Sequence, residues 1–151
     1  MAKQTKTALV GLGNMGEALL EGILRSGAAK AGELVGVEAR EDRAREIAKR
    51  HGVRVVSGVA EGCKDAGTVI LAVKPKDADA ALREMGKLDG KLLVSICAGL
   101  TLSWFAARVS AKARVVRVMP NTPALVGEGA SVYCAGPGVD RASRDRVEKL
   151  L

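Results

Sequence analysis

A glycine-rich loop is the strongest chemical signal in this sequence. It has the pattern G-x-G-x-x-G, and its residues are Gly11, Leu12, Gly13, Asn14, Met15 and Gly16. An apolar run precedes the loop and a helical period follows it, which is the context that a dinucleotide-binding turn requires. There the first glycine permits a tight turn, the second lets backbone approach a pyrophosphate, and the third allows helix and strand to pack closely. Free N–H groups at the helix start then face the phosphates. The alternative is a merely tight strand-to-helix turn.

Charged residues after the second apolar run bear on the choice between NAD and NADP. Dinucleotide folds make this choice about 20 residues beyond the glycines, where an acid binds the ribose hydroxyls or an arginine accommodates the 2′-phosphate. Here Glu38 could accept from the ribose, whereas Arg40 and Arg43 could each grip a phosphate. Because two cations are available, we favour NADP(H), with NAD(H) as the alternative. Both arginines would otherwise lie on the solvated face of the next helix.

Three further segments follow predicted strands, so they should lie at the same edge of a sheet. They are Ala72, Val73, Lys74 and Pro75; Cys97, Ala98 and Gly99; and Asn121 with Thr122. Lys74 could bind an acidic substrate, but a solvated point charge is the simpler interpretation. Cys97 has no histidine nearby in sequence to activate it, and the small residues after it would let backbone approach a flat ring. Asn121 and Thr122 could donate to the nicotinamide or substrate, or could form a rigid turn.

Short apolar runs alternate with segments of helical period along the chain. The pattern predicts strands at 7–11, 34–38, 54–56, 68–73, 92–96 and 115–119, and helices at about 15–26, 43–51, from about 59, 77–85 and 102–109. Gly27 and Gly52 should end the first two helices. This alternation favours an α/β fold, a Rossmann-type, doubly wound, mainly parallel sheet with helices on both faces. A last strand at 130–135 and a helix capped by Asp140 would follow. That helix ends without a capping glycine, which indicates a longer natural chain, so we expect Val147, Leu150 and Leu151 to be left exposed.

The composition narrows the function classes. With 151 residues, 48% hydrophobic and 27% charged, the chain has the size and balance of one globular domain. Its apolar runs are far shorter than the roughly 18 residues of a membrane helix. Cys63, Cys97 and Cys134 lie far apart and His51 is the only histidine, so we expect a reduced, cytoplasmic protein without a metal site. The net charge of +7, with three aromatic residues and dispersed arginines, favours an anionic cofactor over nucleic acid.

Four motifs, in this order along the chain, resemble the pyrroline-5-carboxylate reductase family. They are residues 11–16, 72–75, 95–99 and 119–124. The resemblance covers essentially the whole chain, and Met-Pro-Asn-Thr-Pro at 119–123 is much more specific than the glycine loop. It implies an oxidoreductase of proline biosynthesis that transfers hydride from NADPH or NADH to the cyclic C=N bond of 1-pyrroline-5-carboxylate, giving L-proline.

The resemblance also implies how the work is divided along the chain. Residues 1–135 would form the NAD(P)-binding domain, and residues 136–151 would begin a helix leading to a C-terminal helical domain. In this family that domain completes the substrate pocket and forms the homodimer or higher oligomer. Because it is absent from these residues, we assign no catalytic residue and expect cofactor binding without turnover. His51 should lie at the far end of a peripheral helix, and Tyr133 has no predicted role.

The motifs and the resemblance together predict a set of cofactor contacts. The set is Gly11, Leu12, Gly13, Asn14, Met15, Gly16, Arg40, Ala72, Val73, Lys74, Pro75, Cys97, Ala98, Gly99 and Asn121. The sequence departs from the family at residues 57–59, Ser-Gly-Val, where relatives commonly offer an asparagine near the adenosine. We therefore predict no adenine contact there.

Two other functions stay open. One is another reductase of the β-hydroxyacid or 6-phosphogluconate dehydrogenase group, which shares the glycine loop and an arginine after the second strand but not the Met-Pro-Asn-Thr-Pro segment. The other is a non-catalytic nucleotide-sensing module, since a fold alone does not establish chemistry.

Overall fold

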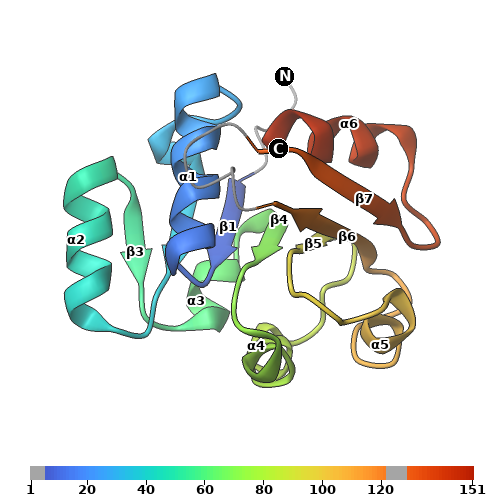
Figure 1. Ribbon diagram of the computed structural model, residues 1–151. Coiled ribbons are helices and arrows are strands. Elements are labelled where there is room, and N and C mark those ends of the chain that lie inside the picture. The colour runs from blue at the N-terminus through green and yellow to red at the C-terminus, as the bar shows by residue number, and fades with distance from the viewer. Residues whose placement is uncertain (1–5, 122–128) are drawn as a thin grey trace.

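The computed structural model describes residues 6–121 and 129–151, which form a seven-stranded sheet with helices on both faces (Figure 1). The strands are β1 (Lys6–Val10), β2 (Leu34–Val37), β3 (Arg54–Val56), β4 (Ala66–Leu71), β5 (Leu92–Ser95), β6 (Arg114–Pro120) and β7 (Ser131–Ala135). Their order in the sheet is β3-β2-β1-β4-β5-β6-β7. Strands from β3 to β6 pair in parallel, and β7 pairs with β6 antiparallel. The order reverses at β1, which is the switch point where doubly wound folds bind ligands.

The helices begin and end close to the predicted positions. They are α1 (Asn14–Ser26), α2 (Glu41–His51), α3 (Val59–Cys63), α4 (Ala78–Met85), α5 (Leu102–Ala106) and α6 (Arg141–Leu150), with short 3-10 turns at η1 (Ala31–Glu33) and η2 (Pro75–Asp77). Helix α1 ends at Gly27 and α2 at Gly52, both with positive φ, a conformation that glycine adopts without strain. The Asp140 carboxylate caps α6 by accepting from the Ser143 N–H at 2.8 Å. These predicted caps are confirmed.

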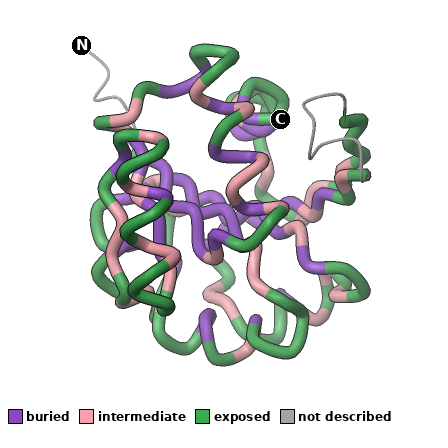
Figure 2. The backbone as a smooth tube through the Cα atoms, turned by 60° about the vertical axis from the view of Figure 1, so that its left-hand side comes forward, coloured by how far each residue is buried: buried purple, intermediate pink, exposed green. Residues whose placement is uncertain are grey.

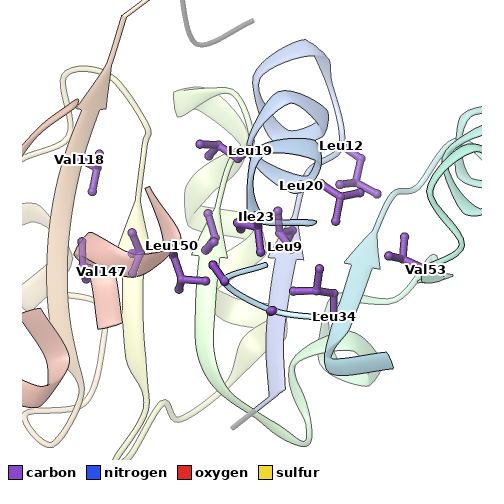
Figure 3. Packing of buried hydrophobic residues seen from close by; sticks show 14 of the residues in the cluster. Leu9, Leu12, Leu19, Leu20, Ile23, Leu34, Val53, Val118, Val147 and Leu150 are labelled. Atoms are coloured by element: carbon purple, nitrogen blue, oxygen red, sulfur yellow. The ribbon is translucent and has the colours of Figure 1, made fainter. Parts of the chain in front are cut away.

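Two apolar clusters lie on opposite faces of the sheet. Leu9 of β1 faces the cluster built with α1, α2 and α6, whereas Ala8 and Val10 face the cluster built with α3, α4 and α5. This alternation is what a pleated strand produces. Figure 2 shows the buried residues gathered in the sheet between largely exposed outer segments, and Figure 3 shows part of the first cluster. The predicted Rossmann-type fold with helices on both faces is therefore confirmed.

The expected exposure of the last helix is wrong for two of its three apolar residues. Val147 and Leu150 are buried in the same cluster as Leu9, while Leu151 is exposed (Figure 3). The reason is that α6 folds back over the sheet and covers apolar surface beside α1. Elsewhere in the described chain, exposed large apolar side chains occur at Met119 and Val132, which are paired across β6 and β7.

The described helices have at most 13 residues. Within residues 6–121 and 129–151, none of them combines the length and the apolar character needed to cross a bilayer.

Candidate functional site

The predicted binding segments follow the carboxyl ends of neighbouring parallel strands. Backbone hydrogen bonds continue past the strand ends and tie these segments together: Gly11 N–H donates to the Val37 carbonyl at 3.0 Å, and Ala72 N–H donates to the Val10 carbonyl at 2.8 Å. One strand further along, Ile96 N–H donates to the Leu71 carbonyl at 3.0 Å. The glycine loop and the segments at 72–75 and 97–99 therefore share one edge of the sheet.

Each glycine of the loop meets a different local demand. Gly11 has a φ of 96°, and a Cβ there would lie 2.8 Å from the backbone carbon and oxygen of Ala72. At Gly16 a Cβ would lie 2.0 Å from the Gly11 carbonyl oxygen. At Gly13, by contrast, a Cβ would meet nothing within 4 Å. The first and third glycines are thus required by close packing, whereas the second faces open space that a ligand can enter.

The start of α1 supplies hydrogen-bond donors at this open space. The helix begins with a bond from Glu17 N–H to the Gly13 carbonyl at 2.9 Å, and its N-cap residue, Gly13, has no side chain to satisfy the first turn. The N–H groups of Asn14, Met15 and Gly16 come before Glu17, whose N–H is the first donor within the helix, so they have no intrahelical partner. Together with the positive end of the helix dipole they suit an anion such as a pyrophosphate. These residues fit a dinucleotide.

The two candidate arginines after β2 differ sharply in environment. The Arg40 side chain is 69% exposed and contacts Asp42 at 3.3 Å, while its backbone N–H donates to the Glu38 carboxylate at 3.0 Å. The Arg43 side chain is only 16% exposed and pairs with Glu17. Arg40 is therefore free to turn toward a phosphate, whereas Arg43 is largely buried against Glu17 and does not lie on the solvated face of α2.

The segments after β4 and β5 bring small and apolar groups to the edge. Ala72 and Val73 are half-buried, whereas Lys74 and Pro75 are exposed at the start of η2. Beside them the Cys97 thiol is buried and donates to the Val73 carbonyl at 3.3 Å. The next two residues, Ala98 and Gly99, are exposed, and Gly99 has a φ of 77°. The exposure of Lys74 agrees with a solvated charge, and this part of the edge is uncrowded.

Asn121, directly after β6, hydrogen-bonds to Ala130, directly before β7. Its side-chain oxygen accepts from Ala130 N–H at 3.0 Å, and its own backbone N–H donates to the Ala130 carbonyl at 3.3 Å. This pairing supports the interpretation of Asn121 as part of a turn between β6 and β7. The predicted role of Thr122 falls on residues 122–128, which lie outside the described residues.

Neither of the two remaining candidates for an acid points to the shared edge. His51 is the last residue of α2, as predicted, and its Nε2 lies 2.9 Å from a Glu17 oxygen. The Tyr133 hydroxyl donates to the Glu148 carboxylate of α6 at 2.6 Å. Glu17 was missed by the sequence interpretation, although an acidic residue directly after the glycine loop was a usable signal.

Two hollows of the described surface lie away from this edge. One of about 430 Å³ is lined by α1, α6 and the start of β7, and an apolar one of about 250 Å³ lies between α5 and the ends of β6 and β7. Neither includes a residue of the glycine loop. The strand ends are the candidate site, because an extended dinucleotide lies across an open edge of the sheet rather than in a closed pocket.

The thiols should differ in reactivity. Burial raises the pKa of Cys63 to about 11 and also raises the pKa of Cys97, whereas Cys134 is exposed. Because the thiolate is the reactive form, we expect a disulfide reagent at pH 8 to modify Cys134 at least about tenfold faster than the buried pair. Reaction at Cys63 should speed up as pH rises toward its pKa. In denaturant all three should react alike, and rapid modification of Cys97 in the folded protein would contradict its burial.

Comparison with known proteins places the described geometry in a family. The family model described as NADP oxidoreductase coenzyme F420-dependent matches residues 6–99, which is more than half of the chain. The pyrroline-5-carboxylate reductase of Mycobacterium leprae is 35% identical over 143 residues, covering 90% of this chain and 48% of that protein. The enzyme of the same name from Arabidopsis thaliana is 36% identical over 143 residues, covering 91% of this chain and 50% of that protein.

Solved structures are similar over nearly the whole chain. The Plasmodium falciparum pyrroline carboxylate reductase with NADP bound has a TM-score of 0.83 and 31% identity, covering 97% of this chain and 53% of that one. A pyrroline-5-carboxylate reductase from Coxiella burnetii has a TM-score of 0.92 at 24% identity, covering 98% of this chain and 56% of that one, and so supports the fold alone. This chain spans about half the length of the relatives that it matches.

Proposed function

This chain belongs to the family described as NADP oxidoreductase coenzyme F420-dependent, and from that premise we propose that it is the cofactor-binding domain of a pyrroline-5-carboxylate reductase. Such an enzyme reduces 1-pyrroline-5-carboxylate to L-proline with NADPH. The observation that carries the proposal is the shared edge, where the glycine loop, the 72–75 segment and the 97–99 segment lie around the N-terminus of α1. Relatives of the same name, 31–36% identical, support the substrate assignment.

The cofactor would supply the hydride for the C=N bond when bound, and the chain's own residues would bind and orient it. The first-turn N–H groups of α1 hold the pyrophosphate, and the space beside Gly13 lets backbone approach it. The exposed Arg40 side chain would bind the 2′-phosphate. The remaining proposed contacts, residues 72–75, 97–99 and Asn121, line the half of the cofactor that carries the nicotinamide. Orientation of this kind supplies a large part of a two-reactant rate enhancement.

The proposal divides the work as the family resemblance implies. Residues 1–135 bind the cofactor, and residues 136–151 begin the connection to further residues that hold the substrate carboxylate and protonate the imine nitrogen. The complete enzyme would be cytoplasmic and a homodimer or higher oligomer. We expect the present polypeptide to bind cofactor without forming proline. Measurable proline formation by these 151 residues would contradict that division.

The first test is calorimetric titration of the protein with NADPH and with NADH. We expect saturable binding of NADPH, and weaker binding of NADH if the 2′-phosphate is recognised. Binding of neither cofactor would refute the proposed function of this domain.

Removal of the Arg40 guanidinium should change cofactor preference. Because Arg40 is exposed and pairs with the exposed Asp42, Arg40→Ala should leave stability nearly unchanged. Loss of a charge-assisted contact to the 2′-phosphate should weaken NADPH by about 10- to 100-fold while NADH is hardly affected. The two dissociation constants measured for Arg40→Ala and for Arg45→Ala, an exposed control on α2, provide the check. Equal losses for both cofactors would show that Arg40 does not select between them.

A further inference from the structure

A charge cluster between α1 and α2 has no part in the cofactor contacts described above. The Glu17 side chain of α1 is 14% exposed and receives three groups from α2: the Arg43 guanidinium, Arg50 at 2.6 Å and His51 at 2.9 Å. Burial alone would raise the pKa of Glu17, but the hydrogen bonds from His51, Arg50 and Arg43 outweigh it and hold the pKa below its usual value. Glu17 is therefore an ionised carboxylate that holds the two helices together.

Arg43 extends this cluster to the glycine loop. Its Nε donates to the Leu12 carbonyl at 3.1 Å, while its terminal nitrogens bond to Glu17 and, at 3.2 Å, to Glu46. A planar guanidinium with a fixed fork of donors is suited to hold several acceptors at once. One side chain thus links the loop to both helices.

The bond to Leu12 has a geometric consequence for the neighbouring N–H group. The carbonyl of Leu12 and the N–H of Gly13 belong to one planar peptide unit, and in a trans peptide they point in opposite directions. When Arg43 holds the carbonyl on the side of α2, the Gly13 N–H must face away from Arg43. Leu12 is fully buried on one side of this peptide, but at Gly13 a Cβ would meet nothing within 4 Å, so no side-chain packing holds the Gly13 side.

We propose that Arg43, held by Glu17, is a positioning residue for the phosphate-binding loop. It orients the Leu12–Gly13 peptide so that the Gly13 N–H and the first turn of α1 present donors to a pyrophosphate. The inference rests on the proposed dinucleotide binding and deepens it. Since NADPH and NADH share the pyrophosphate, loss of Arg43 weakens both by the same factor, in contrast to loss of Arg40.

Removal of Arg43 leaves neither Glu17 nor Glu46 without a positively charged or hydrogen-bonding partner. Glu17 keeps Arg50 and His51 as partners when Arg43 is absent, and Glu46 keeps Arg50. Arg43→Met retains most of the aliphatic stem and removes every donor. Arg43→Lys retains the charge beside Glu17, but its single nitrogen cannot reproduce the fork that reaches the Leu12 carbonyl. Arg45→Met is the matched control, because Arg45 is exposed on the same helix and pairs with the exposed Glu41.

The experiment measures affinities for NADPH, NADH and 2′-AMP by calorimetry, together with the melting temperature. We expect Arg43→Met to weaken NADPH and NADH equally, by about tenfold, and to leave 2′-AMP unchanged because that ligand lacks the pyrophosphate. Arg43→Lys should lose affinity for both cofactors at an unchanged melting temperature, which covers the case in which the methionine variant does not fold. Arg45→Met should match wild type.

A readout without cofactor tests the loop itself. In ¹⁵N-labelled protein, the backbone amide signals of Gly13 and Asn14 should shift in Arg43→Lys and stay in place in Arg45→Met. Unchanged signals and affinities in both Arg43 variants would overturn the inference, as would a loss confined to NADPH and 2′-AMP, which would make Arg43 a 2′-phosphate ligand. Absence of cofactor binding by the wild-type protein would instead refute the proposed function, so the two failures are distinguishable.

Discussion

Gly13→Val should abolish measurable cofactor binding while leaving the domain folded. Gly13 has a φ of −70° and a ψ of −166°, an extended conformation that valine adopts readily, and a Cβ would meet no atom within 4 Å. The folded chain therefore has room for the valine side chain. That side chain would occupy the space through which a pyrophosphate approaches the backbone. We expect affinity for NADPH and NADH to fall by at least about 100-fold. The melting temperature should change by only a few degrees, because an N-cap substitution costs about 1 kcal/mol.

The control for this substitution is Gly22→Val, which adds the same side chain to α1 at a position where a Cβ also meets nothing within 4 Å. It lies two turns away from the loop and should bind both cofactors as the wild type does. If Gly13→Val binds NADPH normally, the space beside Gly13 is not the pyrophosphate site. If Gly13→Val unfolds, the separation of binding from stability at this glycine is wrong.

Gly16→Ala, in contrast to Gly13→Val, should mainly lower the stability of the domain. A Cβ on Gly16 would lie 2.0 Å from the Gly11 carbonyl oxygen, which belongs to backbone and cannot swing aside. The start of α1 would have to move off the loop, and overpacking of this kind costs about 3 kcal/mol. For a domain of this size the melting temperature should drop by roughly 6–12 °C. Cofactor affinity should fall as well, because the moved helix no longer aims its N–H groups at the same point.

Thermal and urea unfolding of Gly16→Ala and Gly22→Ala would measure the effect. Gly22 lies in the same helix with free space at its Cβ position, so alanine there should stabilise the protein by up to about 1 kcal/mol through reduced backbone entropy. Wild-type stability of Gly16→Ala would contradict the close approach of α1 to the glycine loop.

Local features of the fold were accessible from the sequence. The glycine loop, the caps at Gly27, Gly52 and Asp140, and the strand at 54–56 lie where the pattern predicts them. Each depends on residues within a few positions of one another, so composition and spacing suffice. The prediction was less accurate at element ends, as with α5, which stops at Ala106 instead of continuing to 109. Such ends depend on packing as much as on local preference.

Some features of the candidate site were likewise predictable from the sequence, and others depended on packing. The sequence alone predicted that residues 72–75 and 97–99 lie at the same sheet edge as the glycine loop, because parallel strands that alternate with helices share one carboxyl edge. Both Arg40 and Arg43 were phosphate candidates near the start of one helix, and the predicted contact set named Arg40 alone without a physical reason to exclude Arg43. Only the packing of α2 against α1 separates them, by bringing Arg43 to a glutamate 26 positions earlier in the chain.

The sequence by itself determined the order of strands and helices, the glycines that make the loop and the edge where a dinucleotide would bind. These follow from local backbone preferences and from apolar periodicity. Tertiary structure alone decided that α6 buries Val147 and Leu150, that Asn121 pairs with Ala130, and that Arg43 serves the loop from within the fold. Each of those outcomes depends on contacts between residues distant in the chain, which apolar periodicity does not specify.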